Sequence, residues 1–127
     1  MKDLDWSNLS FGYRQTDYNV RCYYRDGKWG EIEVCSDEYL KLHMAATCLH
    51  YGQEAFEGLK AYRCPDGKVR VFRMDENAKR LQSTCRGILM PEVPTEMFEE
   101  IYPPFYHQQL RMSWILSRRL VLAVLLP

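Results

Sequence analysis

The stretch "LHYGQEAFEGLKAY", Leu49 to Tyr62, reads as a helix joined to a strand. It also holds Gly52, Gly58, a Glu-Gly step and three aromatic residues within fourteen positions. Glycine weakens the interior of a helix or a strand, because it loses more conformational freedom on folding than other residues do. The two glycines therefore need a reason, which the rest of the sequence must supply.

Two β-hairpins are predicted around this stretch. The first covers residues 17–35, where runs rich in Val, Ile, Tyr and Trp flank "RDGK". Its Asp26-Gly27 step supplies the positive φ values that a tight hairpin turn requires. The second covers about residues 57–73, where "EGLKAYR" and "VRVFR" flank "CPDGK", with Pro and Gly at positions that favour a turn.

A helix from about 76 to 89 is predicted to follow the second hairpin. It begins after Asp75 and ends before Pro91 and Pro94. Thr95 is placed to cap a further short helix in "TEMFEEI". The apolar residues that recur at helical spacing in the longer helix are Ala78, Leu81, Cys85 and Ile88. Two hairpins followed by a helix predict an α+β fold, in which the helix covers one face of an antiparallel sheet.

Composition limits the classes of function. A chain of 127 residues has the size of one domain, and its 17 basic residues equal its 17 acidic ones. This balance gives no electrostatic attraction toward nucleic acid or an anionic membrane, so we expect a small molecule or a protein as partner. The five cysteines are at least thirteen residues apart, and "MKDLDWSNLSFGY" resembles neither a signal nor a transit peptide. We expect reduced cysteines and a cytoplasmic protein.

The C-terminal segment differs in character from the rest. From about residue 101, "IYPPFYHQQLRMSWILSRRLVLAVLLP" contains three Arg, no acidic residue and a Leu/Val-rich end. Residues 114–127 are too few and too charged to span a bilayer. A helix lying on a membrane surface stays open as an alternative.

Few residues point to chemistry on physical grounds alone. Arg80 and Arg86 lie about 240° apart around the predicted helix, so each is judged separately. An exposed position is favoured for both, and binding of a phosphate by a fixed guanidinium is the alternative. A structural role is favoured for His50 and Tyr51. No His or Cys lies at metal-ligand spacing from His50 or His43, so no metal site is expected.

A resemblance to a known family carries the interpretation further. "LHYGQEAFEGLKAYR", the following Asp-Gly turn, "VFR" and "NAKRLQSTCRGILMPEVP" resemble the N-terminal small domain of branched-chain amino-acid aminotransferases. These are pyridoxal-phosphate enzymes of aminotransferase class IV, with the D-amino-acid aminotransferase-like fold. The opening "MKDLDWSNLSFGYRQTDY" is also similar to bacterial members. D-amino-acid aminotransferases and aminodeoxychorismate lyases share the fold, but "AFEGLKAY" favours the branched-chain group.

The resemblance implies roles for particular residues. Arg80 matches the arginine that grips the phosphate of pyridoxal 5'-phosphate. The resemblance also implies that a turn at Gly52 and close packing at Gly58 bring two aromatic residues to one wall of a site. The pocket for the substrate side chain is implied to contain Phe11, Tyr51 and Phe56. Aromatic rings suit this role because branched aliphatic groups are selected by apolar area and shape.

The same resemblance implies what is missing. In the family, a Schiff-base lysine and a carboxylate near the pyridine nitrogen lie in a large C-terminal domain. None of the six lysines of this chain stands in the matching context, so no catalytic residue is assigned. We expect residues 1–100 to be the small domain and residues 101–127 to be a non-family tail left by truncation or a frameshift.

The function implied by the resemblance is reversible amino transfer between leucine, isoleucine or valine and 2-oxoglutarate, by a homodimer. The substrates are thus amino acids and 2-oxo acids, with no nucleic acid and no membrane involved. The chain alone is expected to be inactive. The alternatives are a non-catalytic regulatory module that pairs with a full-length subunit, and a membrane-surface protein that uses the apolar tail.

Overall fold

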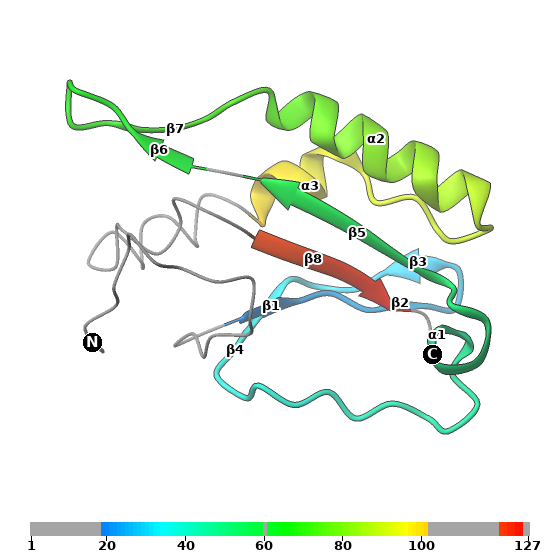
Figure 1. Cartoon of the computed structure of the whole chain (residues 1–127). Coiled ribbons are helices and arrows are strands. Elements are labelled where there is room, and N and C mark those ends of the chain that lie inside the picture. The colour runs from blue at the N-terminus through cyan, green and yellow to red at the C-terminus, as the bar shows by residue number, and fades with distance from the viewer. Residues whose placement is uncertain (1–18, 60, 102–119, 126–127) are drawn as a thin grey trace. The chain divides into compact units, whose positions relative to one another are not determined.

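The computed structural model describes residues 19–59, 61–101 and 120–125. They belong to two compact units, Met1–Lys41 and Leu42–Pro127. Every strand pair among the described residues is antiparallel, and the second unit adds helices (Figure 1). The expected α+β class is confirmed at this level. The expected single sheet is not found, because the described strands form four separate pairs.

The first unit contains the first predicted hairpin, which is confirmed. β1 (Asn19–Arg21) pairs with β4 (Glu33–Cys35), and β2 (Tyr24–Arg25) pairs with β3 (Lys28–Trp29). The turn lies at Asp26 and Gly27, whose φ angles are 51° and 79°. Positive φ at both central residues is the geometry that a two-residue hairpin turn needs.

The opening stretch begins with a short helix and continues as a strand. α1 (Thr47–Tyr51) ends at Gly52, which adopts the left-handed conformation with φ 61° and ψ 28°. The backbone N–H of Glu54 then donates to the carbonyl of Gly52 (2.9 Å), and β5 (Glu54–Leu59) begins. The predicted turn at Gly52 is confirmed. Its reason is a backbone conformation that residues with a Cβ rarely adopt.

β5 has one buried and one exposed face. Ala55, Glu57 and Leu59 are buried, whereas Glu54 and Phe56 are exposed. Gly58 lies on the face of Phe56, and among the described residues a Cβ at Gly58 would meet only the Phe56 ring, at 3.5 Å. This is an ordinary van der Waals distance. The close packing implied for Gly58 is therefore not found in the part of the chain that the structure describes.

The second hairpin is confirmed but is shorter than predicted. β6 (Ala61–Arg63) pairs with β7 (Val69–Val71). In the turn between them, Gly67 has φ 77° and its N–H donates to the carbonyl of Cys64 (2.9 Å). The prediction began at residue 57, but residues 57–59 belong to β5. "EGLKAYR" contains no Pro and no Asp-Gly step between the two strands, so its residues do not mark the boundary between β5 and β6.

β5 pairs with a strand from the C-terminal segment instead. β8 (Leu120–Leu125) runs antiparallel to β5, with Leu125 opposite Glu54 and Leu120 opposite Leu59. A membrane-surface helix is therefore wrong for residues 120–125. The continuous ladder of backbone hydrogen bonds along β5 favours an extended conformation for this apolar run.

Two helices complete the second unit. α2 (Met74–Gly87) begins two residues before its predicted start and contacts β5, as Figure 1 shows, and it also contacts α3 (Thr95–Glu100). The chain leaves α2 at Leu89, where φ is 57° and the N–H of Met90 donates to the carbonyl of Cys85 (2.8 Å). This αL ending explains why the helix stops before Pro91.

Both predicted helix caps are wrong. Arg73 precedes α2, and Asp75 lies in its first turn, where a carboxylate still interacts favourably with the helix dipole. Pro94 precedes α3, and Thr95 is its first residue. The Thr95 hydroxyl oxygen accepts a hydrogen bond from Nε2 of Gln82 (3.2 Å), so it links the two helices.

The core of the second unit lies where α2, α3 and the buried face of β5 meet. Phe98, Leu81 and Cys85 are the largest fully buried side chains. Around them are buried Ala55, Leu59, Ala78, Met90, Val93 and Ile101. α2 covers one face of β5, whereas the sequence predicts that it covers one face of a single antiparallel sheet. Glu57 is the one charged side chain buried among the described residues.

Candidate functional site

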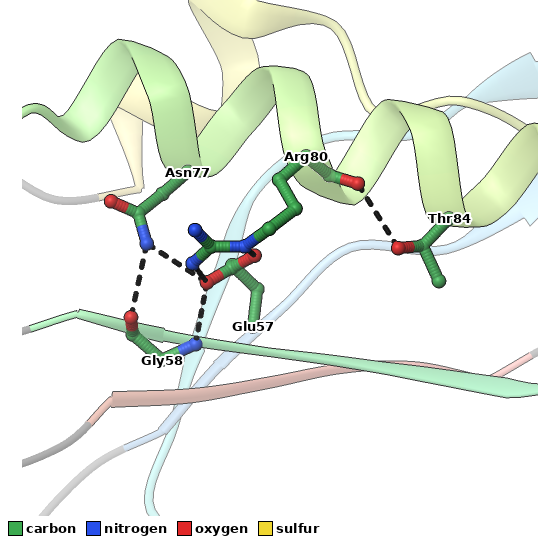
Figure 2. A network of polar contacts seen from close by, with 5 residues as sticks. All are labelled: Glu57, Gly58, Asn77, Arg80 and Thr84. Carbon is green, nitrogen blue, oxygen red and sulfur yellow. Dashed lines mark hydrogen bonds and ion pairs between the residues drawn. The ribbon is translucent and has the colours of Figure 1, made fainter.

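An ion pair joins β5 to α2 in the second unit. Arg80, on α2, donates from Nε to Oε2 of Glu57 (2.8 Å) and from Nη2 to Oε1. Figure 2 shows the guanidinium lying over the carboxylate, with Asn77 one turn earlier on the helix. Such a two-point contact fixes both the distance and the plane of the guanidinium.

Every oxygen of the Glu57 carboxylate is hydrogen bonded. Besides Arg80, Oε1 accepts from Nδ2 of Asn77 (2.8 Å) and from the backbone N–H of Gly58 (3.0 Å). Burial raises the pKa of the Glu57 carboxyl, but the hydrogen bonds from Arg80 and Asn77 and the charge of Arg80 outweigh it, so the pKa is lowered. Glu57 is therefore a carboxylate at neutral pH, although only 5% of its side chain is exposed.

Arg80 is exposed although its partner is buried. Its side chain is 64% exposed, and the hydrogen bonds to Glu57 raise its pKa. A guanidinium has five N–H donors, of which this contact uses Nε and one on Nη2. The remaining donors lie on the side away from the carboxylate. The predicted exposed position of Arg80 is confirmed, and the arrangement leaves a charged group able to bind an anion.

Arg86 has a different environment. Its Nη1 lies 2.5 Å from Oε2 of Glu92, and both side chains are exposed. Ion pairs of this kind contribute little and exchange readily with water. The two arginines of α2 thus differ in their partners. Arg80 pairs with a buried carboxylate whose oxygens are all hydrogen bonded, and Arg86 pairs with an exposed one.

The three aromatic residues implied for the pocket differ in what the structure says of them. Tyr51, the last residue of α1, is 84% exposed, and Phe56, on β5, is 60% exposed. Phe56 lies on the face of β5 opposite to Glu57, and hence opposite to Arg80. That Tyr51 and Phe56 form one wall stays a prediction. Phe11 lies outside the described residues.

His43 and His50 make contacts with residues close to them in the chain. Nε2 of His50 donates to the carbonyl of Met44 (2.6 Å), and Nδ1 of His43 accepts from the N–H of Ala45 (3.1 Å). The contact of His50 agrees with the structural role predicted for it. Within residues 19–59, 61–101 and 120–125, no group of three or more His, Cys, Asp or Glu is placed to hold a metal ion.

Glu57 and Asn77 are the residues of this site that sequence reasoning missed. No role is assigned to either residue from the sequence. A signal was available. Alternation along β5 places Glu57 with Ala55 and Leu59 on the buried face, where a carboxylate needs a cationic partner. Arg80, on the covering helix, can supply that charge.

Known proteins resemble this chain over most of its length. It is 54% identical over 98 residues to a branched-chain-amino-acid aminotransferase of Haemophilus influenzae and 48% identical over 98 residues to one of Helicobacter pylori. These matches cover 77% of the chain. This chain is a homologue of the branched-chain-amino-acid aminotransferases. The family resemblance expected from the sequence is confirmed. No protein-family model matches the chain.

The homology to branched-chain-amino-acid aminotransferases is partial in extent. The chain spans 29% of the length of the two bacterial relatives. It is also 39% identical over 92 residues to the Aminotransferase atnJ of Emericella nidulans, covering 72% of this chain and 25% of that protein. What the three relatives' names share is amino transfer, so the family is one of enzymes.

In the part of the chain that the structure describes, no helix has the length and apolar character that a bilayer crossing requires.

Proposed function

We propose that this chain is the small-domain portion of a cytoplasmic branched-chain amino-acid aminotransferase with the class IV fold. The complete enzyme would transfer amino groups reversibly between leucine, isoleucine or valine and 2-oxoglutarate, as a homodimer. The observation that carries this proposal is the 54% identity over 98 residues to the Haemophilus influenzae aminotransferase.

Arg80 is proposed to hold the phosphate of pyridoxal 5'-phosphate. Three properties of its side chain fit that group. The guanidinium is positively charged, it has N–H donors that Glu57 does not use, and its plane is fixed by Glu57. Phosphate oxygens accept parallel hydrogen bonds from two such donors. When bound, the cofactor supplies an electron sink for breaking bonds at the substrate's α-carbon.

Tyr51, Phe56 and Phe11 are proposed to contact the substrate side chain. For Tyr51 and Phe56 this proposal is supported by their exposure, because both aromatic side chains lie largely at the surface on either side of the Gly52 turn. A branched aliphatic group gains free energy from contact with such surface, because both lose contact with water.

The chain by itself is proposed to be inactive, because no lysine in it matches the catalytic one. Lys79 illustrates the point: its Nζ lies 2.9 Å from Oε1 of Glu76 and 3.4 Å from Oδ2 of Asp75. These hydrogen bonds raise the pKa of Lys79. A lysine that acts as a nucleophile needs the opposite shift.

A chimera tests the proposal. In the Haemophilus influenzae aminotransferase, the 98-residue segment that matches this chain is replaced by the matching residues of this chain. The transfer of the amino group from leucine to 2-oxoglutarate is then measured. We expect the chimera to be active. Within it, Arg80→Ala should raise the cofactor concentration for half-maximal activity roughly tenfold to a hundredfold, and Arg86→Ala should leave it unchanged. A folded but inactive chimera would contradict the proposal.

The isolated chain provides the complementary test. The purified protein should show no transamination with leucine and 2-oxoglutarate at saturating cofactor, and measurable turnover would overturn the proposed inactivity. Stable copurification with a full-length aminotransferase subunit would instead favour the regulatory module as its role.

A further inference from the structure

Glu57 occupies an unusual place for a charged residue, at the buried face of β5 beneath an exposed arginine. We propose that Glu57 is a positioning residue, which sets the guanidinium of Arg80 in the orientation that binds a phosphate group. This inference rests on the proposed function, in which Arg80 contacts phosphate. It adds that the contact depends on Glu57, with Asn77 as its support.

The carboxylate is held still by the backbone of its own strand. Oε1 accepts from the N–H of Gly58 (3.0 Å), the next residue in β5, and from Nδ2 of Asn77 (2.8 Å). The same Asn77 nitrogen lies 3.1 Å from the carbonyl oxygen of Gly58. Figure 2 shows Glu57 and Gly58 on the strand side of the guanidinium and Asn77 beside it. These hydrogen bonds hold the Glu57 carboxylate in place independently of Arg80.

The fixed carboxylate then determines where the open donors of Arg80 point. Nε and Nη2 both donate to it, so the planar guanidinium cannot turn about the Cδ–Nε bond without losing a contact. The free N–H groups on Nη1 and Nη2 must therefore face away from β5. An unrestrained arginine would lose the entropy of several rotamers on binding an anion, and this one has already lost most of it.

Stability alone does not explain a carboxylate at this position. Its neighbours on the buried face of β5 are Ala55 and Leu59, and the facing helix buries Ala78 and Leu81. An apolar side chain would pack there without the cost of desolvating a charge, and replacing a buried ion pair by apolar groups is often neutral or stabilising. The carboxylate makes sense if the orientation of Arg80 matters.

The experiment uses the full chain labelled with ¹⁵N and follows the Nε–Hε signal and the Nη signals of Arg80 by NMR. Inorganic phosphate is titrated into the wild type and into Glu57→Gln, Glu57→Asp and Asn77→Ala. Glu92→Gln is the matched control, because it removes the carboxylate partner of the other arginine on α2.

We expect phosphate to shift the Arg80 signals in the wild type, with slow exchange of Nε–Hε before phosphate is added. Glu57→Gln should weaken the response about tenfold and speed the exchange. Glu57→Asp should partly restore the phosphate response and the slow exchange of Nε–Hε. Glu92→Gln should change neither the response nor the exchange. A role confined to folding would not produce this rescue by charge. If Glu57→Gln does not fold, Asn77→Ala decides, with an expected loss of intermediate size.

Two results would overturn the inference, and they differ in what else they affect. An unchanged phosphate response in folded Glu57→Gln, or in folded Asn77→Ala where Glu57→Gln does not fold, removes the role of Glu57 and leaves Arg80 as the phosphate contact. The absence of any response at Arg80 in the wild type removes both this inference and the role proposed for Arg80.

Discussion

The hairpin of the first unit and the α2–β5 region of the second are stabilised in different ways. Not one described residue of the first unit, 19–41, is buried, whereas α2, α3 and β5 enclose a core around Phe98 and Leu81. The hairpin depends on backbone pairing, a good turn and surface contacts such as the edge-to-face rings of Tyr24 and Trp29, 5.2 Å apart. Isolated hairpins are marginally stable in water.

This difference shows where the candidate site draws its rigidity. Glu57 and Arg80 both lie on elements that contribute to the buried core, so their relative position is fixed by apolar packing as well as by their own hydrogen bonds. A charged group is positioned most reliably on such elements.

The largest effect is expected from opening the core. Phe98→Ala should lower the free energy of unfolding by about 3–5 kcal/mol, because it removes a fully buried ring and leaves a cavity. Trp29→Ala in the hairpin should cost about 1 kcal/mol. Urea denaturation followed by circular dichroism measures both. Equal losses would show that the hairpin contributes as much to stability as the core does.

The next largest effect is expected at Glu57. Glu57→Ala should lower the free energy of unfolding by about 1–3 kcal/mol, since Asn77 Nδ2 and the Gly58 N–H lose an acceptor at a buried position. Differential scanning calorimetry gives the change. Stability equal to the wild type would mean that water replaces the carboxylate and that the site is open to solvent.

The charge of Glu57 also predicts a dependence on pH. Its pKa is lower in the folded chain than in the unfolded one, so its contribution to stability is present above about pH 4.3, the usual Glu value, and is lost as pH falls through the lower folded value. Urea midpoints between pH 7 and pH 3 should therefore fall more steeply in the wild type than in Glu57→Gln. Parallel curves would contradict the ion pair.

A smaller effect is expected at the turn between α1 and β5. Gly52→Ala should cost about 1 kcal/mol, because alanine is strained at φ 61°. Gly87→Ala is the control: it lies in α2 with open space around its Cα and no positive φ, so alanine should stabilise the chain by roughly 0.5–1 kcal/mol. Thermal unfolding compares the two, and the same sign for both would refute the left-handed turn.

The smallest effect is expected at the exposed pair of Asp66 and Arg70. The hydrogen bonds from Arg70 lower the pKa of Asp66, yet both side chains are about half exposed. Asp66→Asn should leave the urea midpoint within experimental error, because exposed ion pairs exchange with water at little net gain. A clear shift would show that the β6–β7 turn depends on this pair.

Local signals in the sequence predicted local structure. Asp26-Gly27 and Gly67 predict their turns because positive φ is a property of one or two residues. The period of Ala78, Leu81 and Cys85 predicts α2 and its buried face. The predicted caps Asp75 and Thr95 are wrong because a helix can start one or two residues earlier at little cost in free energy. The helices in fact follow Arg73 and Pro94.

Contacts between distant segments were not predictable in the same way. Nothing in "EAFEGL" specifies "LVLAVL" as its pairing partner, since many apolar strands would satisfy the same backbone groups. The Glu57–Arg80 pair needs the helix to be placed on the strand first. Arg80 itself was identified only through resemblance to a family, because an exposed arginine on a helix is common.

The pairing of β5 with β8 also dictates an order of events during synthesis. The two strands are separated in the chain by β6, β7, α2 and α3, so β5 emerges from the ribosome long before its partner exists. Closing such a long loop is slow compared with forming a helix. In the interval α2 can already cover one face of β5, while the edge later taken by β8 stays open to any chaperone that recognises unpaired strands.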